Sequence, residues 1–155
     1  MKLLSALLAT LFLVHVQALA APYMISADGH EVTDQATGLT WRRCSEGMGW
    51  DGSTCAGTVL TFSRENALTR SKTEAAASDK VWRLPNVKEL GSLVDRSRGL
   101  PAIKVAIFPA TPSIWFWSSS TYVNNSKLAW VVNFGGGYNG GTDADCAVRL
   151  VRASQ

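Results

Sequence analysis

The chain is poor in the residues on which metal centres and hydrolytic active sites depend. Beyond its apolar N-terminal run His30 is the only histidine, and the three cysteines, Cys44, Cys55 and Cys146, include no CxxC pair. A zinc site needs three or four such ligands close together, so the sequence argues against zinc. No G-x-S-x-G motif is present to hold a nucleophilic serine. We therefore expect a protein that is not an enzyme and has no catalytic residues.

Neither sign of charge dominates the sequence. With Lys2 set aside as part of the N-terminal run, 14 basic residues stand against 12 acidic ones, a formal net charge of +2. The basic residues are scattered, and the only tight pairs are Arg42-Arg43 and Arg96 with Arg98. Nucleic-acid binders carry a clustered basic face. The composition therefore argues against a nucleic-acid partner, while a modest anion site remains open.

The one long apolar run lies at the N-terminus. Lys2 supplies a positive start, residues 3–16 are mostly apolar, and Ala18-Leu19-Ala20 has the A-x-A form of a cleavage site. The run is shorter than the roughly 20 apolar residues of a membrane span. We expect residues 1–20 to be a signal peptide. Residues 21–155 should form one exported domain, periplasmic or extracellular, with no membrane span.

Three cysteines in an exported chain favour one disulfide and one remaining thiol. Cys44 and Cys55 bracket a Gly-rich segment without regular periodicity, which a bridge between them would order. We predict a Cys44–Cys55 disulfide. Cys146 then remains as a buried thiol, an interchain bridge or a reactive group.

Local signals in the first half of the domain predict a hairpin and a helix. Residues 30–33 and 38–44 have the pattern of two strands around a turn that contains Asp34 and Gly38. Thr61 or Ser63 can cap a helix that runs to about Ser78.

A second helix should follow, and then an irregular segment. Asn86 and Glu89 have the spacing of a capping box, and the helix they begin should end by residues 99–101. Prolines preclude regular structure from 101 to 113, where we expect apolar side chains to pack against the core. These side chains are Ile103, Ile107 and Phe108.

The C-terminal part reads as strands joined by polar loops. Strands are predicted at residues 115–122, 129–134 and 147–152, with a long, flexible, Gly-rich loop at 135–143. Four of the six tryptophans lie in distinctive phrases or in the strand at 129–134, where side chains of alternating character indicate a half-buried strand, and we expect these four to be largely buried. They are Trp41, Trp82, Trp117 and Trp130.

Four phrases occur in a distinctive order: TGLTWRRC at 37–44, WRLPNVKEL at 82–90, FWSSSTY at 116–122 and AVRLVR at 147–152. In this order they resemble the Lcl C-terminal domain family, named after the Legionella collagen-like adhesin, and more distantly C-type-lectin-type folds. The resemblance implies an α+β, C-type-lectin-like single domain with two helices, an N-terminal hairpin and a C-terminal antiparallel sheet. It also implies internal contacts for Arg83, Arg149 and Arg152. The G-X-Y repeat of a collagen-like stalk is missing.

Aromatic and amide side chains gather in two C-terminal loops, a composition shared by binding surfaces and, more simply, by turns. The candidate ligand-binding residues are Tyr122, Asn124, Asn125, Lys127, Tyr138, Asn139 and Asp143. Oxygen donors of the kind that calcium accepts lie in the second loop, although the Glu-Pro-Asn and Trp-Asn-Asp signatures of C-type lectins are absent. They are Asp143, Asp145, Asn139 and Thr142. We expect no cofactor, with calcium as the one alternative left open.

The function predicted from these observations is an exported, non-catalytic module that binds a surface glycan or cell-surface receptor in adhesion. An anionic or sulfated glycan would be met by guanidinium or ammonium groups. The candidates for this role are Arg42, Arg43, Arg96, Arg98 and Lys127. The alternative is a structural or assembly subunit of a surface adhesin or appendage, which would make protein–protein contacts. Either role leaves room for oligomers.

Overall fold

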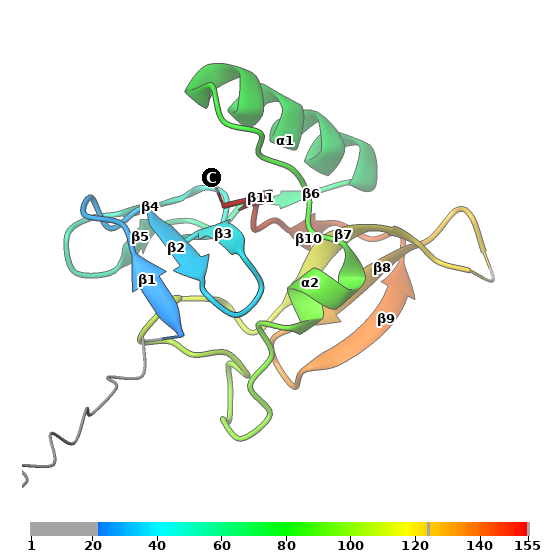
Figure 1. Ribbon diagram of the computed structural model, residues 1–155. Coiled ribbons are helices and arrows are strands. Elements are labelled where there is room, and N and C mark those ends of the chain that lie inside the picture. The colour runs from blue at the N-terminus through cyan, green and yellow to red at the C-terminus, as the bar shows by residue number, and fades with distance from the viewer. Residues whose placement is uncertain (1–21, 124, 155) are drawn as a thin grey trace, which may run out of the picture.

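The computed structural model describes residues 22–123 and 125–154. The predicted signal peptide and Asn124 lie outside the described residues. The elements, in chain order, are β1 (Tyr23–Ile25), β2 (Glu31–Asp34), β3 (Leu39–Arg42), β4 (Met48–Trp50), β5 (Cys55–Gly57), β6 (Thr61–Phe62), α1 (Arg64–Ser78), α2 (Val87–Gly91), β7 (Trp115–Thr121), β8 (Ala129–Asn133), β9 (Tyr138–Thr142), β10 (Cys146–Ala147) and β11 (Val151–Ala153). The predicted α+β class with two helices and antiparallel sheets is confirmed (Figure 1).

The N-terminal sheet has the strand order β1-β2-β3-β11, so the first and last strands of the domain belong to one sheet. The predicted hairpin is present, with Val32 opposite Trp41 and the turn closed by a hydrogen bond from the Gly38 amide to the Asp34 carbonyl. Gly38 has a φ of +65°, a conformation that glycine adopts without strain. β11 pairs antiparallel with β3 on its other side.

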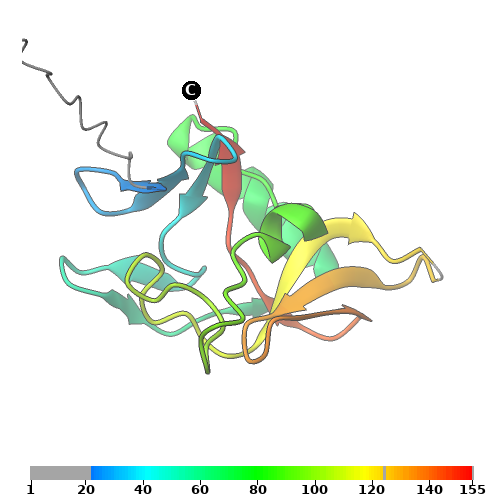
Figure 2. The ribbon, with the colours of Figure 1, turned by 60° about the horizontal axis from the view of Figure 1, so that its bottom comes forward.

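The C-terminal sheet has the order β6-β10-β7-β8-β9 and separates two apolar clusters. Side chains alternate between the faces of a strand. Phe116 and Val132 therefore pack on one face with Trp41, while Trp117 and Val131 pack on the other face with Ala67 of α1. Figure 2 shows the β7–β9 part of this sheet extending away from the N-terminal strands.

The predicted last strand, residues 147–152, is wrong as a single element. It consists of β10 in the C-terminal sheet and β11 in the N-terminal sheet. Between them residues 148–150 are buried, and their carbonyls accept hydrogen bonds from elsewhere: Val148 O from the Glu46 amide and Leu150 O from the Arg42 amide. The chain crosses from one sheet to the other within this predicted strand.

The predicted flexible loop at 135–143 is also wrong, because Tyr138–Thr142 forms β9, the edge strand next to β8. Its glycines leave space for aromatic rings. A Cβ at Gly140 would lie 3.3 Å from the Trp115 ring, and one at Gly141 would lie 2.6 Å from the Tyr122 ring. Here the absence of a side chain marks close ring-to-backbone packing in a strand rather than flexibility.

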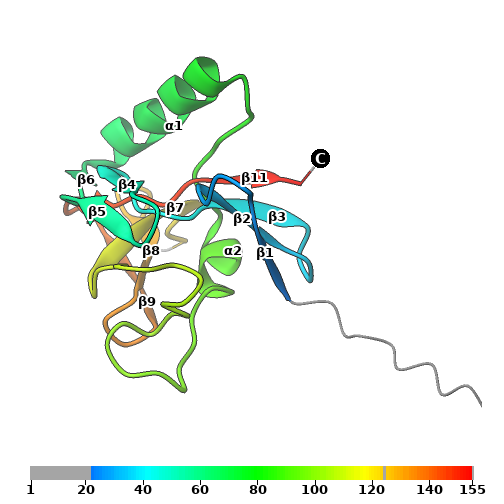
Figure 3. The same ribbon diagram turned by 90° about the vertical axis from the view of Figure 1, so that its left-hand side faces the viewer.

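Both predicted helix starts are confirmed. The Ser63 hydroxyl accepts from the Asn66 amide at the start of α1, and Asn86 and Glu89 form the complete capping box of α2. The predicted end of the second helix is wrong, since α2 stops at Gly91. After it the chain continues in turns, and Val94 then forms a bridge with Ile103, which removes it from the helix. α1 and the irregular segment after α2 lie on opposite sides of the molecule (Figures 1 and 3).

The predicted packing of the irregular segment at 101–113 and the predicted Cys44–Cys55 disulfide are both present in the structure. Ile103 and Phe108 are buried and Ile107 packs against the same cluster. Cys44 and Cys55 form a disulfide with a Cα–Cα distance of 5.5 Å, and Cys146 is an unpaired buried thiol. Among the described residues, neither helix is long and apolar enough to cross a membrane.

The tryptophan predictions are correct for three of the four positions. Trp41, Trp82 and Trp117 are buried, at 0%, 3% and 0% exposure. Trp130 is only half-buried, because it projects from the distal part of β8, where the Tyr122 ring packs against it with a centroid distance of 4.6 Å.

Candidate ligand-binding surface

Three side chains on neighbouring strands form an exposed row near one end of the C-terminal sheet. Trp115 of β7 lies opposite Asn133 of β8, which lies opposite Tyr138 of β9. Residues directly opposite each other in antiparallel strands project from the same face. Trp115 is 37% exposed and Tyr138 is 68% exposed, so the rings flank a central amide on accessible surface. We call Trp115, Asn133 and Tyr138 the aromatic row.

Glycines support both rings of the row from below. The Trp115 ring lies against Gly140 of β9, where an added Cβ would come within 3.3 Å of it. The Tyr138 ring lies over Gly136, where a Cβ would overlap it at 2.2 Å. Both rings therefore pack on main chain instead of filling a core, which limits their freedom while they remain accessible to a ligand.

Asn133 adds a polar group between the rings. Its Oδ1 accepts a hydrogen bond from the Gly135 amide at 2.5 Å, which orients the side chain. Neighbouring strands are about 4.8 Å apart, so the backbones at Trp115 and Tyr138 lie about 10 Å from each other, with Asn133 between them. Rigid aromatic contacts with an amide between them are the chemistry that binding surfaces use for rings that carry hydroxyl groups.

The opposite face of the same strands carries a second, more packed aromatic pair. Tyr122 lies over Gly141 and against Trp130, and both rings are half-buried. Asn139 is exposed and projects from this face, because it precedes Gly140 by one residue and lies opposite Val132. Tyr138 and Asn139, which the sequence grouped together, therefore point to opposite sides of the sheet.

The predicted ligand-binding residues divide between two ends of the β8–β9 hairpin. Tyr122, Asn125, Lys127 and Asp143 lie at the end where Ala129 pairs with Thr142. Tyr138 lies at the other end, where it pairs with Asn133, and Asn139 is next to it, opposite Val132. Four residues of strand correspond to about 13 Å. Asn124, the remaining candidate, lies outside the described residues. In one chain these residues do not form one site.

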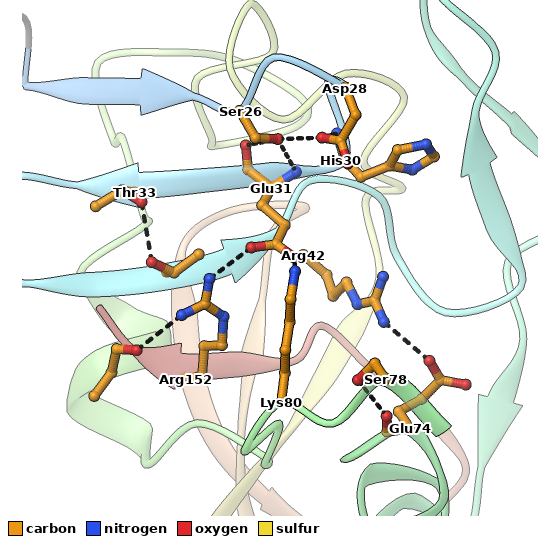
Figure 4. Close-up of polar contacts among 12 residues, drawn as sticks. Ser26, Asp28, His30, Glu31, Thr33, Arg42, Glu74, Ser78, Lys80 and Arg152 are labelled. Atoms are coloured by element: carbon orange, nitrogen blue, oxygen red, sulfur yellow. Dashed lines mark hydrogen bonds and ion pairs between the residues drawn. The ribbon is translucent and has the colours of Figure 1, made fainter. Parts of the chain in front are cut away.

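Most of the predicted anion-binding arginines make intramolecular contacts. Arg42 pairs with Glu74 at 3.1 Å (Figure 4) and lies over the Trp82 ring. Arg43 is buried, with its guanidinium 3.8 Å from the Trp50 ring centroid and its Nε donating to the Ile107 carbonyl. Arg98 pairs with Asp95.

Arg96 and Lys127 differ from these arginines. Both are exposed, and neither pairs with a carboxylate among the residues that the structure describes. Arg96 donates from Nη2 to the Gly137 carbonyl at 2.9 Å, so its charge lies at the turn that leads into Tyr138.

Arg83, Arg149 and Arg152 make the internal contacts that the family resemblance implied. Arg83 pairs with Glu89, and Arg152 donates to Glu31 at 2.7 Å. Glu31 also accepts from Lys80, as Figure 4 shows. Burial alone would raise the pKa of Glu31, but the hydrogen bonds from Lys80 and Arg152 hold it below its ordinary value.

A polar cleft of about 280 Å³ lies between β3, β4 and α1. The charged groups at its wall are Arg42, Glu46, Arg70 and Glu74, and they pair with one another. His30 lies at the same cleft. Within residues 22–123 and 125–154, no group of three or more His, Cys, Asp or Glu side chains could hold a metal ion.

Cys146 is the thiol that a cysteine-based oxidation would have to use. It is 2% exposed, and its Sγ donates to the Ala144 carbonyl. Burial, and then the nearby charge of Asp145, raise its pKa to about 11. The thiol is therefore protonated at neutral pH, whereas the thiolate is the reactive form.

Sequence reasoning missed Trp115 and Asn133 as members of the exposed row. Each lies in a predicted strand, and the alternation of side chains along a strand showed which of its neighbours share its face. Their juxtaposition depends on the β7–β8 and β8–β9 registers, which no local pattern specifies.

A family model described as Lcl C-terminal domain matches residues 30–152, from just before β2 into β11. No curated protein and no solved structure matched the chain.

Proposed function

The chain belongs to the Lcl C-terminal domain family, and from this premise we propose that it is an exported, non-catalytic module that binds a surface glycan through the aromatic row. The family assignment suggests an adhesin-related extracellular module. The Cys44–Cys55 disulfide is consistent with an oxidising compartment outside the cytoplasm.

The observation that carries the proposal is the exposure of two large aromatic rings beside one amide. Trp115 and Tyr138 lie on glycines at the surface, with 37% and 68% of their area exposed. Tyrosine and tryptophan provide wide contact area at low entropic cost, and asparagine can both donate and accept. A sugar ring offers its apolar face to the aromatic side chains and its hydroxyl groups to the amide of Asn133.

We further propose that an anionic ligand, if it is the natural one, is met by Arg96 and Lys127. These are the two candidate cations that are both exposed and without a carboxylate partner among the described residues, whereas Arg43, which also has none, is buried. Calcium stays an untested alternative, with Asp143 and Asp145 as exposed donors. A C-type-lectin-like architecture is also a proposal, supported by the pairing of the N-terminal hairpin with the last strand in one sheet.

A glycan array with the purified protein tests the ligand class, run with and without calcium and at low and high salt. Tyr138→Ala should reduce binding about tenfold, since loss of about 1.4 kcal/mol of ring contact corresponds to that factor. Tyr138→Phe retains the ring and should bind nearly as well as the unchanged chain. Affinity that falls as salt rises would identify an anionic ligand, because exposed charge pairs are screened.

Leu100→Ala is the matched control, because Leu100 is another exposed apolar side chain, at 76% exposure, outside the row. Its binding should be unchanged. Full binding by both Tyr138→Ala and Trp115→Ala would place the ligand elsewhere and defeat the proposal.

A structural or assembly role is the second candidate function. The outer edge of β9 favours it, because no strand pairs with this edge within the described parts of the chain. Under this alternative the exposed aromatic rings would contact protein instead of sugar.

A further inference from the structure

β9 is an edge strand without the usual protection against pairing. Its sequence, Tyr-Asn-Gly-Gly-Thr, contains no charged residue and no proline, and it is the longest edge strand in the structure as described. Natural edge strands are commonly blocked by lysine, proline, a bulge or very short length. The other edge of this sheet, β6, has two residues, and β1 has three. The β9 edge is therefore the one most suited to accept another strand.

Opposite charges lie at the two ends of β9. Arg96 is hydrogen-bonded to Gly137 just before the strand, and Asp143 follows its last residue, with Asp145 two residues later. Both aspartates are exposed and accept no hydrogen bond from the residues described. One end of the edge is therefore basic, and the other is acidic on balance, because Asp143 and Asp145 outnumber Lys127 there.

We propose that β9 pairs antiparallel with β9 of a second copy of this chain, with Gly140 on the two-fold axis. In this register Tyr138 lies opposite Thr142 of the second copy, and Gly137 lies opposite its Asp143. Each basic end then meets the other copy's acidic end, giving two Arg96–Asp143 pairs per dimer. Parallel pairing would instead bring like charges together, so charge selects the antiparallel arrangement.

The side chains near the axis are compatible with this pairing. Gly140 has no side chain to obstruct the approach, and the Trp115 ring that covers it would lie beside Trp115 of the second copy. Both rings would remain on the accessible face, because strand pairing occupies the edge of a sheet and not its faces. The dimer would thus join two aromatic rows into one continuous surface.

The pairing also brings together candidate residues that one chain keeps apart. Tyr138 of one copy would approach Thr142 and Asp143 of the other, at the end where Lys127 lies. The dimer inference does not depend on the ligand, and its test uses none.

Sedimentation velocity of the purified chain, up to about 1 mM, tests the dimer directly. A five-residue edge is a small interface, so we expect a weak, concentration-dependent dimer with a Kd on the order of 100 μM. Arg96→Glu and Asp143→Arg should each raise the Kd about tenfold, because each turns two attractive contacts into two repulsive ones. The combined Arg96→Glu, Asp143→Arg variant should restore the original Kd.

Lys72→Glu on α1 is the control, since it makes the same change of charge as Arg96→Glu at an exposed position away from β9. Its Kd should equal that of the unchanged chain. Circular dichroism and thermal melting show whether each variant is folded, and hydrogen exchange at β9 should slow as protein concentration rises. A monomer over the whole range, or a double variant no better than the single ones, overturns the proposal.

Discussion

At the scale of single residues, Arg149 has the most unusual environment. It is 0% exposed, has no carboxylate partner among the described residues, and lies 5.0 Å from the Phe108 ring centroid. Burial lowers its pKa to about 9, which leaves it protonated at neutral pH. Its guanidinium donates to four acceptors: the carbonyls of Arg42 and Arg43 and the hydroxyls of Ser45 and Thr111. One side chain thus links the segment after β3, the irregular segment and the crossing between the two sheets.

Arg149→Lys should destabilise the fold by about 3 kcal/mol, since a single ammonium cannot reach all four acceptors and each buried group left unpaired costs about 1–3 kcal/mol. Urea unfolding at neutral pH measures the change. Arg64→Lys is the control, because Arg64 is less buried and donates to a single side chain, that of Thr121. It should shift stability by about 0.5 kcal/mol or less. Equal midpoints for Arg149→Lys and the unchanged chain would show that the four contacts contribute little.

At the scale of elements, α2 is stabilised by its N-terminus more than by its length. It has five residues, too few for a helix that persists alone. Glu89 accepts from the Asn86 amide at 2.8 Å and from both terminal nitrogens of Arg83 at 2.8 Å. The hydrogen bond from Arg83 is the largest effect on the pKa of Glu89 and lowers it. Burial has the opposite effect, but the pKa remains below its ordinary value.

Because the pKa of Glu89 is lower in the folded state than its ordinary value of 4.5, its contribution to stability is present above that pH and is lost as pH falls through the folded value. Glu89→Gln should therefore be less stable at pH 7, by about 1 kcal/mol, and should lose less stability than the unchanged chain below pH 4.5. Unfolding curves at a series of pH values give both quantities. The exposed Glu65 provides the control as Glu65→Gln, and parallel pH profiles for Glu89→Gln and the unchanged chain would contradict the prediction.

At the scale of the whole molecule, α1 lies over the body with little apolar contact. Ala67 and Ser71 are its only buried residues, and it lies to one side of the sheets (Figure 3). Ion pairs make the principal connections, with Arg70 bound to Glu46 at 2.7 Å and Glu74 bound to Arg42 at 3.1 Å. Such a helix opens at a lower free-energy cost than the central strands do.

Hydrogen exchange should therefore be faster in α1 than in β8, and the difference should grow at about 1 M salt, where charges are screened beyond about 3 Å. The β8 amides serve as the internal control, because Val131 and Val132 are buried between the two clusters and their exchange should respond less to salt. Protection of α1 equal to that of β8, unchanged by salt, would mean that packing and not charge attaches the helix.

The sequence by itself determined the features that depend on neighbours along the chain. The caps at Ser63 and Asn86, the turn from Asp34 to Gly38 and the Cys44–Cys55 bridge all follow from short-range geometry, in which one residue's options are limited by others a few positions away. The burial of Trp41 and Trp117 follows from their size and apolar character. Two of the four phrases that carried the family resemblance, TGLTWRRC and WRLPNVKEL, lie in these locally constrained segments.

Only the tertiary structure decided where strands pair and what their side chains meet. From the sequence alone the glycines of β9 predict a flexible loop, because nothing local reveals that Trp115 and Tyr122 occupy the space above them. The division of residues 147–152 between two sheets, and the row of Trp115, Asn133 and Tyr138, depend on registers between distant strands. A shift of one residue would turn each side chain to the other face while leaving the sequence pattern the same, so the candidate surface exists only through long-range pairing.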